Sequence, residues 1–157
     1  PTRRSSDLLS QRHFRLVCQL LEEYRVGPMP GLEEALSALR RRGIPFGVVS
    51  SSWRWYVEHC LRELDMYEDA AVIVTGSDGL PLKPAPAPYQ AAARVFRPAP
   101  PGAVLAVEDS GSGVRSAVAA GLACAAVYNP DSGAQDLSPA RWRLNSLYEL
   151  PALLDGN

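Results

Sequence analysis

Helical and strand-like hydrophobic patterns alternate along this chain, and that alternation constrains its fold more than any other feature. Apolar residues recur at helical spacing in five stripes, which begin at Phe14, Leu32, Val57, Tyr89 and Val114. Short apolar runs lie between and after these stripes, at residues 44–49, 71–75, 104–107, 123–128 and 142–144. This order predicts an α/β fold with a mostly parallel sheet, flanking helices and right-handed crossovers.

Residues 1–30 differ from the remainder of the chain. They supply one amphipathic helix and then a break rich in Pro and Gly, and the first strand-like run starts only at residue 44. A final helix is predicted over residues 147–154. The total length of 157 residues suits about one domain. We therefore expect a helical segment over residues 1–27 and a core domain over residues 28–157.

The net charge and the cysteine content indicate which partners and which cellular compartment suit this protein. Sixteen basic and seventeen acidic residues give a net charge of −1, which favours neither a nucleic-acid partner nor a membrane surface. The run Arg40–Arg42 is interpreted as the basic end of a helix. Three scattered cysteines have no metal-binding spacing, which favours a reducing, cytoplasmic compartment. His13 and His59 have no companion ligands, and each is expected to be a packing or surface residue rather than a catalytic base.

Two adjacent carboxylates follow the apolar run at residues 104–107. Glu108 and Asp109 stand where a strand ends, and ligands of open α/β sheets gather beyond the carboxyl ends of strands. Two crowded carboxylates repel each other unless a cation lies between them, and hard oxygen ligands suit Mg²⁺. The alternative is that they are solvated acidic residues at the start of the next helix.

Two other strand ends carry groups suited to an anion. Ser50 and Ser51 follow the run at 44–49, where hydroxyls and free backbone N–H groups can cradle a phosphate. The alternative is that Ser51 or Ser52 simply caps the following helix. Lys83 precedes a proline and can serve as a point charge beside an anion, or can be an ordinary surface lysine.

Taken together, these residues resemble the later motifs of the haloacid dehalogenase (HAD) superfamily, in its phosphatase and β-phosphoglucomutase-like subgroup. The similarity covers about residues 28–154 and depends on the order of several short motifs. These are Met29–Gly31, Gly43–Pro45, Ser50–Ser52, Val74–Gly76, Lys83–Pro86, Glu108–Ser110, Ala119–Gly121 and Asn129–Pro130.

The resemblance implies a Rossmann-like core and phosphoryl transfer through an aspartyl-phosphate. By match to the family motifs, Ser50, Ser51 and Lys83 would bind phosphate, with Ser50 and Lys83 as the catalytic pair. Asp109 would bind Mg²⁺, with Glu108 as a direct or water-mediated ligand. The implied substrate is a small phosphorylated metabolite. Its identity, and the choice between phosphatase and phosphomutase, stay open.

One family motif is absent from this sequence. No Asp-x-Asp occurs anywhere, although the family's first strand carries one that includes the nucleophile. The resemblance therefore implies that the first, central strand and most of the helical cap are missing. Residues 1–27 would be a remnant of the cap, and residues 1–8 a candidate non-native junction. We expect no phosphatase turnover by this chain alone, exposed strand edges between Ser50 and Glu108, and a parent protein that is a monomer or weak dimer.

Two readings of other classes remain. The segment 111–116 approaches a dinucleotide-binding glycine pattern, but its third glycine is Ser116 and two carboxylates precede it. The absence of Asp-x-Asp also suits a non-catalytic protein that keeps the HAD fold for interaction.

Overall fold

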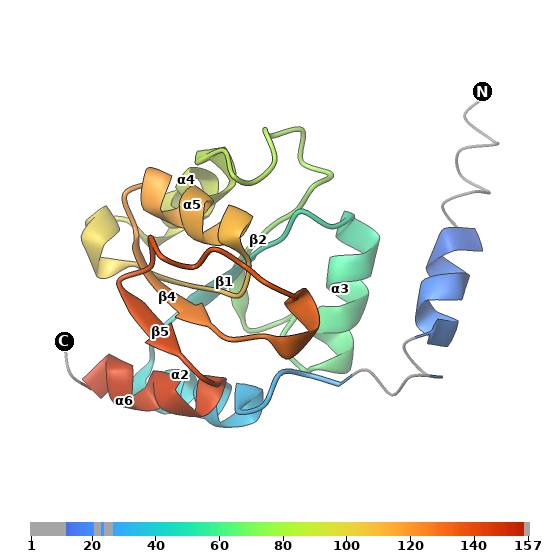
Figure 1. Cartoon of the computed structure of the whole chain (residues 1–157), viewed down its shortest axis with the longest axis horizontal. Helices are drawn as coiled ribbons and strands as arrows, with labels where there is room; N and C mark the ends of the chain where they lie inside the picture. The colour runs from blue at the N-terminus through green and yellow to red at the C-terminus, as the bar shows by residue number, and fades with distance from the viewer. Residues whose placement is uncertain (1–11, 21–22, 24–26, 156–157) are drawn as a thin grey trace.

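The computed structural model describes residues 12–20, 23 and 27–155 (Figure 1). The strands are β1 (Phe46–Val49), β2 (Ala70–Val74), β3 (Leu105–Glu108), β4 (Ala123–Val127) and β5 (Trp142–Leu144). The helices are α2 (Leu32–Arg42), α3 (Arg54–Glu63), α4 (Ala87–Ala93), α5 (Gly111–Ala119) and α6 (Leu150–Asp155). Single 3₁₀ turns occupy Arg94–Phe96, Pro101–Ala103, Pro130–Ser132 and Leu147–Glu149, and residues 12–20 are also helical.

Strands β3, β4 and β5 form a parallel sheet with helices on both faces (Figure 1). Side chains alternate between the faces of a strand, and β4 shows the consequence. Cys124 and Ala126 pack in a cluster with residues of α4 and α5. Ala125 and Val127 pack in a second cluster with residues of α2, β5 and α6. The α/β fold class is thereby confirmed, since a strand covered on both faces is typical of parallel α/β sheets.

Strands β1 and β2 form a separate parallel sheet. The strands lie in register from Gly47 with Val72 to Val49 with Val74, with an irregularity after Phe46. Among the described residues, β1 and β3 do not pair with each other, and no third strand pairs with both of them. The five strands therefore divide into two sheets rather than one continuous sheet.

Local sequence signals account for most element boundaries. Helix α2 has acidic residues in its first turn, Arg40–Arg42 in its last, and Gly43 after it with a left-handed φ of 61°. At α5, Ser110 caps the helix by accepting a hydrogen bond from the Gly113 N–H. The predicted strands begin and end within two residues of the observed ones. The predicted helix 147–154 begins as a 3₁₀ turn and continues as α6.

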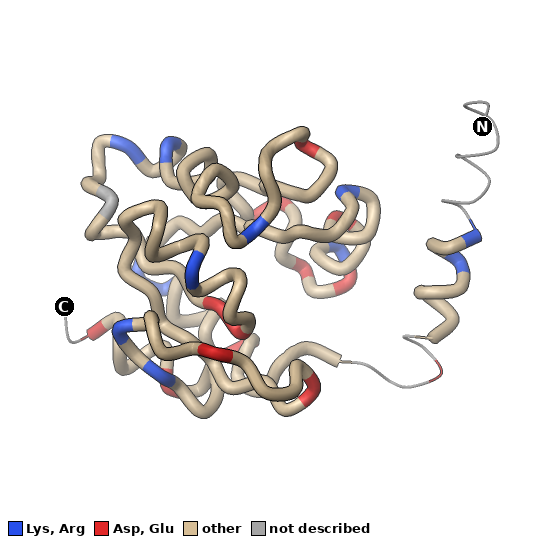
Figure 2. The backbone as a smooth tube through the Cα atoms, turned by 45° about the horizontal axis from the view of Figure 1, so that its top comes forward, with Lys and Arg blue, Asp and Glu red and all other residues tan. Residues whose placement is uncertain are grey.

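Other expectations concern groups outside this core. His13 is exposed and lies edge-on to the Trp55 ring, whereas His59 is partly buried and lies edge-on to the Phe14 ring. All three cysteines are free. No helix of the described residues is long and apolar enough to span a bilayer. Acidic and basic positions are interspersed along the chain (Figure 2). Residues 1–8 and the end of the predicted 1–27 segment lie outside the described residues, so that division stays a prediction.

Candidate functional site

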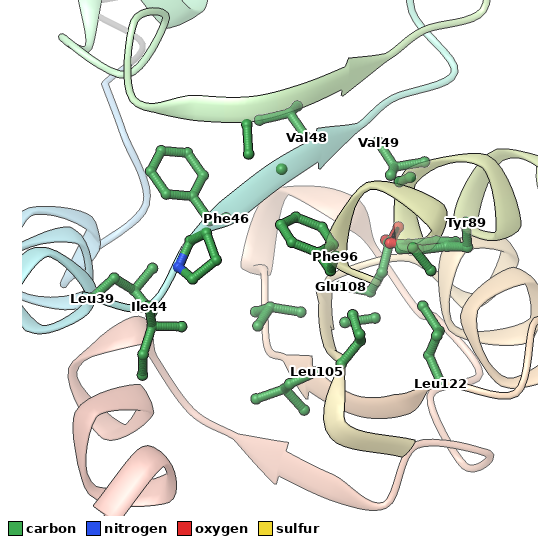
Figure 3. A pocket seen from close by; sticks show the side chains of 18 of the residues that line it. Leu39, Ile44, Phe46, Val48, Val49, Tyr89, Phe96, Leu105, Glu108 and Leu122 are labelled. Carbon is green, nitrogen blue, oxygen red and sulfur yellow. Dashed lines mark hydrogen bonds between the residues drawn. The ribbon is translucent and has the colours of Figure 1, made fainter. Parts of the chain in front are cut away.

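A cavity of about 1060 Å³ lies between the two sheets. Every residue of β1 and of β3 borders it, together with Phe96 and residues from α2 and α4. Figure 3 labels Phe46, Val48 and Leu105 among the apolar side chains that surround this space. Four of the residues singled out from the sequence also line it: Ser50, Lys83, Glu108 and Asp109.

Lys83 is the single lysine of the chain and lies at the polar end of this cavity. Its ammonium donates to the Val49 carbonyl over 3.0 Å and to Glu108 Oε1 over 2.5 Å. The side chain is only 11% exposed. One cation therefore joins the end of β1 to the end of β3, which excludes the reading of Lys83 as a free surface lysine.

Glu108 is the last residue of β3 and is 7% exposed. Besides Lys83, its Oε1 accepts from the Tyr89 hydroxyl over 2.5 Å, and its Oε2 accepts from the Ser110 hydroxyl over 3.2 Å. Burial and the neighbouring Glu108 carboxylate raise the pKa of the Tyr89 phenol, so it remains a proton donor. The assignment of Glu108 as a metal ligand stays a prediction, and both of its oxygens already accept hydrogen bonds.

The third residue of helix α5, Gly113, has no room for a side chain. A Cβ added to Gly113 would lie 2.0 Å from the Glu108 carboxylate. A Cβ on Gly111 would lie 2.9 Å from the Asp136 carbonyl, and the Gly111 N–H donates to Gln135. These glycines are therefore required by protein packing, and the observed geometry gives the dinucleotide reading no support.

Asp109 points to a different set of partners. Its Oδ2 accepts from the Asn129 side chain over 2.7 Å and from the Ser132 hydroxyl over 3.2 Å. Within the described residues its Oδ1 has no hydrogen bond, so one carboxylate oxygen stays available. A hard anionic oxygen held in this way fits the chemistry of a Mg²⁺ ligand. The described residues contain no cluster of three metal-ligating side chains, so Asp109 can be only part of such a site.

The turn at Ser50–Ser52 does not supply a side-chain cap for helix α3. Ser50 Oγ accepts from the Ser52 N–H over 3.1 Å, which fixes the turn after β1. The idea that Ser51 or Ser52 caps the next helix is wrong. Trp53 occupies the N-cap position, and the Arg54 N–H donates to the Ser77 hydroxyl because the loop after β2 lies alongside. Ser51 is exposed and does not border the cavity.

Three contact residues received no role from the sequence. Tyr89 contacts Glu108 from 19 positions away in the chain. Asn129 and Ser132 contact Asp109 from 20 and 23 positions away. Tyr89 and Asn129 stand within or beside motifs that resemble the family, which is the one signal that could have drawn attention to them. Their contacts show that the two carboxylates are oriented by a side chain of α4 and by two side chains of the segment that follows β4.

The sequence of this chain is similar to one protein family and to known phosphatases. The family model that matches is that of the haloacid dehalogenase-like hydrolases, over residues 4–121, which include part of the segment 1–8. YhcW of Bacillus subtilis (strain 168) is 36% identical over 129 residues, which are 80% of this chain and 58% of that protein. Validoxylamine A 7'-phosphate phosphatase of Streptomyces hygroscopicus subsp. limoneus is 31% identical over 71% of this chain and 56% of the enzyme.

A solved structure has the same fold. A mutant of CbbY from Rhodobacter sphaeroides, in complex with xylulose-(1,5)bisphosphate, superposes with a TM-score of 0.71 at 30% identity. The match covers 78% of this chain and 55% of that one. The chain thus spans less than two thirds of the length of each of these relatives.

Proposed function

Because this chain belongs to the haloacid dehalogenase-like hydrolases, we propose that the polar end of its cavity binds the phosphate of a small phosphorylated metabolite during Mg²⁺-dependent phosphate-ester hydrolysis. The observation that carries this proposal is that Ser50, Lys83 and Asp109 border one cavity. The substrate class is supported by the phosphatase and the sugar bisphosphate complex among its relatives.

The phosphate would be held by one cation and by hydrogen-bond donors. Lys83 uses two of its three N–H donors within the protein, so the third is free for a phosphate oxygen. Ser50 accepts from Ser52, which leaves its own hydroxyl proton available to the phosphate. Ser51 would contribute through the exposed turn that follows β1. Charge neutralisation and positioning are the main requirements of phosphoryl transfer.

Asp109 is the residue that we assign to Mg²⁺. Its Oδ1 would serve as ligand while Asn129 and Ser132 fix Oδ2, and Glu108 would keep Lys83 in place and reach the metal at most through water. Bound Mg²⁺ would offset the phosphate charge and polarise the phosphoryl oxygens. The HAD resemblance implies an aspartyl-phosphate. The only acidic residues bordering the cavity within the described residues are Glu108 and Asp109, which have these other roles.

We therefore propose that this chain binds metal and phosphate but does not turn over phosphate esters alone. A nucleophilic mechanism fails without its nucleophile. Mg²⁺ and inorganic phosphate binding can be measured by calorimetry for the purified chain and for two matched variants, Asp109→Asn and Asp131→Asn. Asp131 is exposed and does not border the cavity. We expect Asp109→Asn to weaken Mg²⁺ binding by about tenfold or more, and Asp131→Asn to leave it unchanged.

Equal Mg²⁺ affinity of the two variants would overturn the assignment of Asp109. Turnover is measured separately, with p-nitrophenyl phosphate and Mg²⁺. No release above the rate in buffer is expected, and turnover by the purified chain that disappears in Asp109→Asn would refute the inactivity of the chain.

A further inference from the structure

Two buried hydroxyl groups next to Lys83 have no part in the proposed binding of phosphate. Tyr89 in α4 donates its hydroxyl proton to Glu108 Oε1 over 2.5 Å. Ser116 in α5 donates its hydroxyl proton to the Ala85 carbonyl over 2.6 Å. Both residues are buried, Ser116 completely, and a hydroxyl has a single O–H to donate. Neither donor is therefore left for a phosphate, yet both contacts end beside the lysine that would bind it.

A lysine side chain holds its charge at a defined place only when both of its ends are fixed, because the ammonium is a point charge on a flexible stem. The ammonium of Lys83 is held by the Val49 carbonyl and by Glu108 Oε1. The terminal torsion of a glutamate is broad, so the contact with Lys83 does not by itself orient the Glu108 carboxylate. The position of this ammonium therefore depends on the groups that fix Glu108 and on those that fix the backbone of the lysine.

Tyr89 contacts both members of this ion pair. Its hydroxyl bonds the carboxylate of Glu108, and the Lys83 ammonium lies 5.5 Å from the centroid of its ring. Cation–π attraction acts over this distance. Figure 3 shows the Tyr89 side chain reaching the Glu108 carboxylate from α4. With the Ser110 hydroxyl on Oε2, the Tyr89 hydroxyl on Oε1 fixes the plane of the carboxylate, and the carboxylate in turn fixes the ammonium.

Ser116 acts on the backbone end of the lysine. The Ala85 N–H closes a tight turn around Lys83 by donating to the carbonyl three residues earlier, over 3.0 Å. Ser116 bonds the Ala85 carbonyl of that turn from 31 positions away in the chain. It follows Gly113 by one helical turn in α5, and Gly113 lies directly against the Glu108 carboxylate. One helix therefore fixes both the turn that carries Lys83 and the carboxylate that its ammonium binds.

We propose that Tyr89 and Ser116 are positioning residues for the binding of phosphate. Tyr89 orients the carboxylate that holds the ammonium of Lys83, and Ser116 anchors the turn that carries this lysine. Together they hold the third N–H of the ammonium at the polar end of the cavity, where the anion would lie. The identity of the anion rests on the proposed function, whereas the position of the ammonium can be observed without any ligand.

The first measurement is the affinity for inorganic phosphate, by calorimetry, of the purified chain and of two variants that each remove one hydroxyl. Tyr89→Phe keeps the ring beside Lys83, and Ser116→Ala keeps a good helix former in α5. We expect each variant to bind phosphate about five to ten times more weakly, which is the effect of one lost hydrogen bond near a charge. The matched controls are Tyr56→Phe and Val57→Ala, which alter a partly buried and a buried residue of α3 outside the cavity lining. Both controls should keep the affinity of the parent chain.

The second measurement observes the ammonium directly. Lys83 is the single lysine of the chain, so labelling with ¹⁵N-lysine gives one side-chain ammonium signal in NMR. Without phosphate or metal, we expect this signal to exchange slowly in the parent chain, because Val49 and Glu108 accept two of its hydrogens. The signal should shift and exchange faster in Tyr89→Phe and in Ser116→Ala, and it should stay unchanged in the two α3 variants.

Folded Tyr89→Phe and Ser116→Ala variants whose ammonium signal matches that of the parent chain would overturn the proposal. So would an equal loss of phosphate affinity in Val57→Ala, since lost stability would then explain the effect. The unaltered chain tests the proposal even if neither variant folds, because a rapidly exchanging ammonium would show that Lys83 is not held. If the chain binds no phosphate while both variants change the signal, the proposed function fails and the positioning of Lys83 stands.

Discussion

Strands β4 and β1 have similar apolar sequences but different environments. Four of the five β4 residues are buried, and Cys124 to Val127 are at most 1% exposed. No residue of β1 is fully buried, and Gly47 is exposed. The difference is that β4 has a strand on each side and helices on both faces, whereas β1 has one neighbour and borders the cavity. Hydrophobicity selects the strand, but pairing on both edges determines how completely it is buried.

Lys83 joins the sheet of β1 to the sheet that contains β3 and β4, and its removal should produce the largest effect on stability. Lys83→Ala would leave the Glu108 carboxylate buried without its cation, and we expect a loss of about 3 kcal/mol in the free energy of unfolding. The measurement is urea denaturation. The matched control is Arg62→Ala, because Arg62 forms an exposed pair with Glu58. An equal loss in both variants would show that Lys83 does not hold the sheets together.

Truncation of one valine in each sheet tests the comparison directly. Both valines border the cavity, but they differ in burial. Val127→Ala removes two methyl groups from a side chain in β4 that is 1% exposed, and we expect it to cost about 2 kcal/mol. Val48→Ala makes the same change at a partly buried side chain of β1, and its cost should stay below about 1 kcal/mol because less apolar surface is buried there. Equal costs would mean that β1 is packed as tightly as β4.

A smaller effect concerns the loops that follow β1 and β2. Arg54 donates to both oxygens of Asp78 over 2.8 and 2.9 Å, and this hydrogen bonding lowers the pKa of the Asp78 carboxyl. A lowered folded pKa means that the pair contributes stability above the unfolded pKa of about 3.9. That stability is lost as the pH falls through the folded pKa.

The contribution of this partly exposed pair should be below about 1 kcal/mol. It can be measured as the difference in unfolding free energy between the parent chain and Asp78→Asn, from pH 7 to pH 3. The difference should shrink as the pH falls. A difference that is constant over this range would remove the ion pair as its cause.

The sequence predicted which segments would meet, but not how their side chains would pair. The strand-end rule placed Ser50, Lys83, Glu108 and Asp109 near one edge, and all four border one cavity. The pairing of Lys83 with Glu108 and the separate support of Asp109 by Asn129 were not predicted. A local sequence pattern predicts which strand end carries a given side chain. Its hydrogen-bond partner depends on distances between segments that are far apart in the chain.

Periodicity by itself determined the order of strands and helices and the α/β class, because the spacing of apolar residues follows from local backbone geometry. The turn at Gly43 and the cap at Ser110 are local in the same sense. The resemblance to the family also predicted unpaired strand edges between Ser50 and Glu108, but only the tertiary structure decided which neighbour each strand has, with β1 beside β2 and β4 between β3 and β5. Strand pairing joins residues that are distant in sequence, so an apolar run shows that a strand forms and leaves open which neighbours it has.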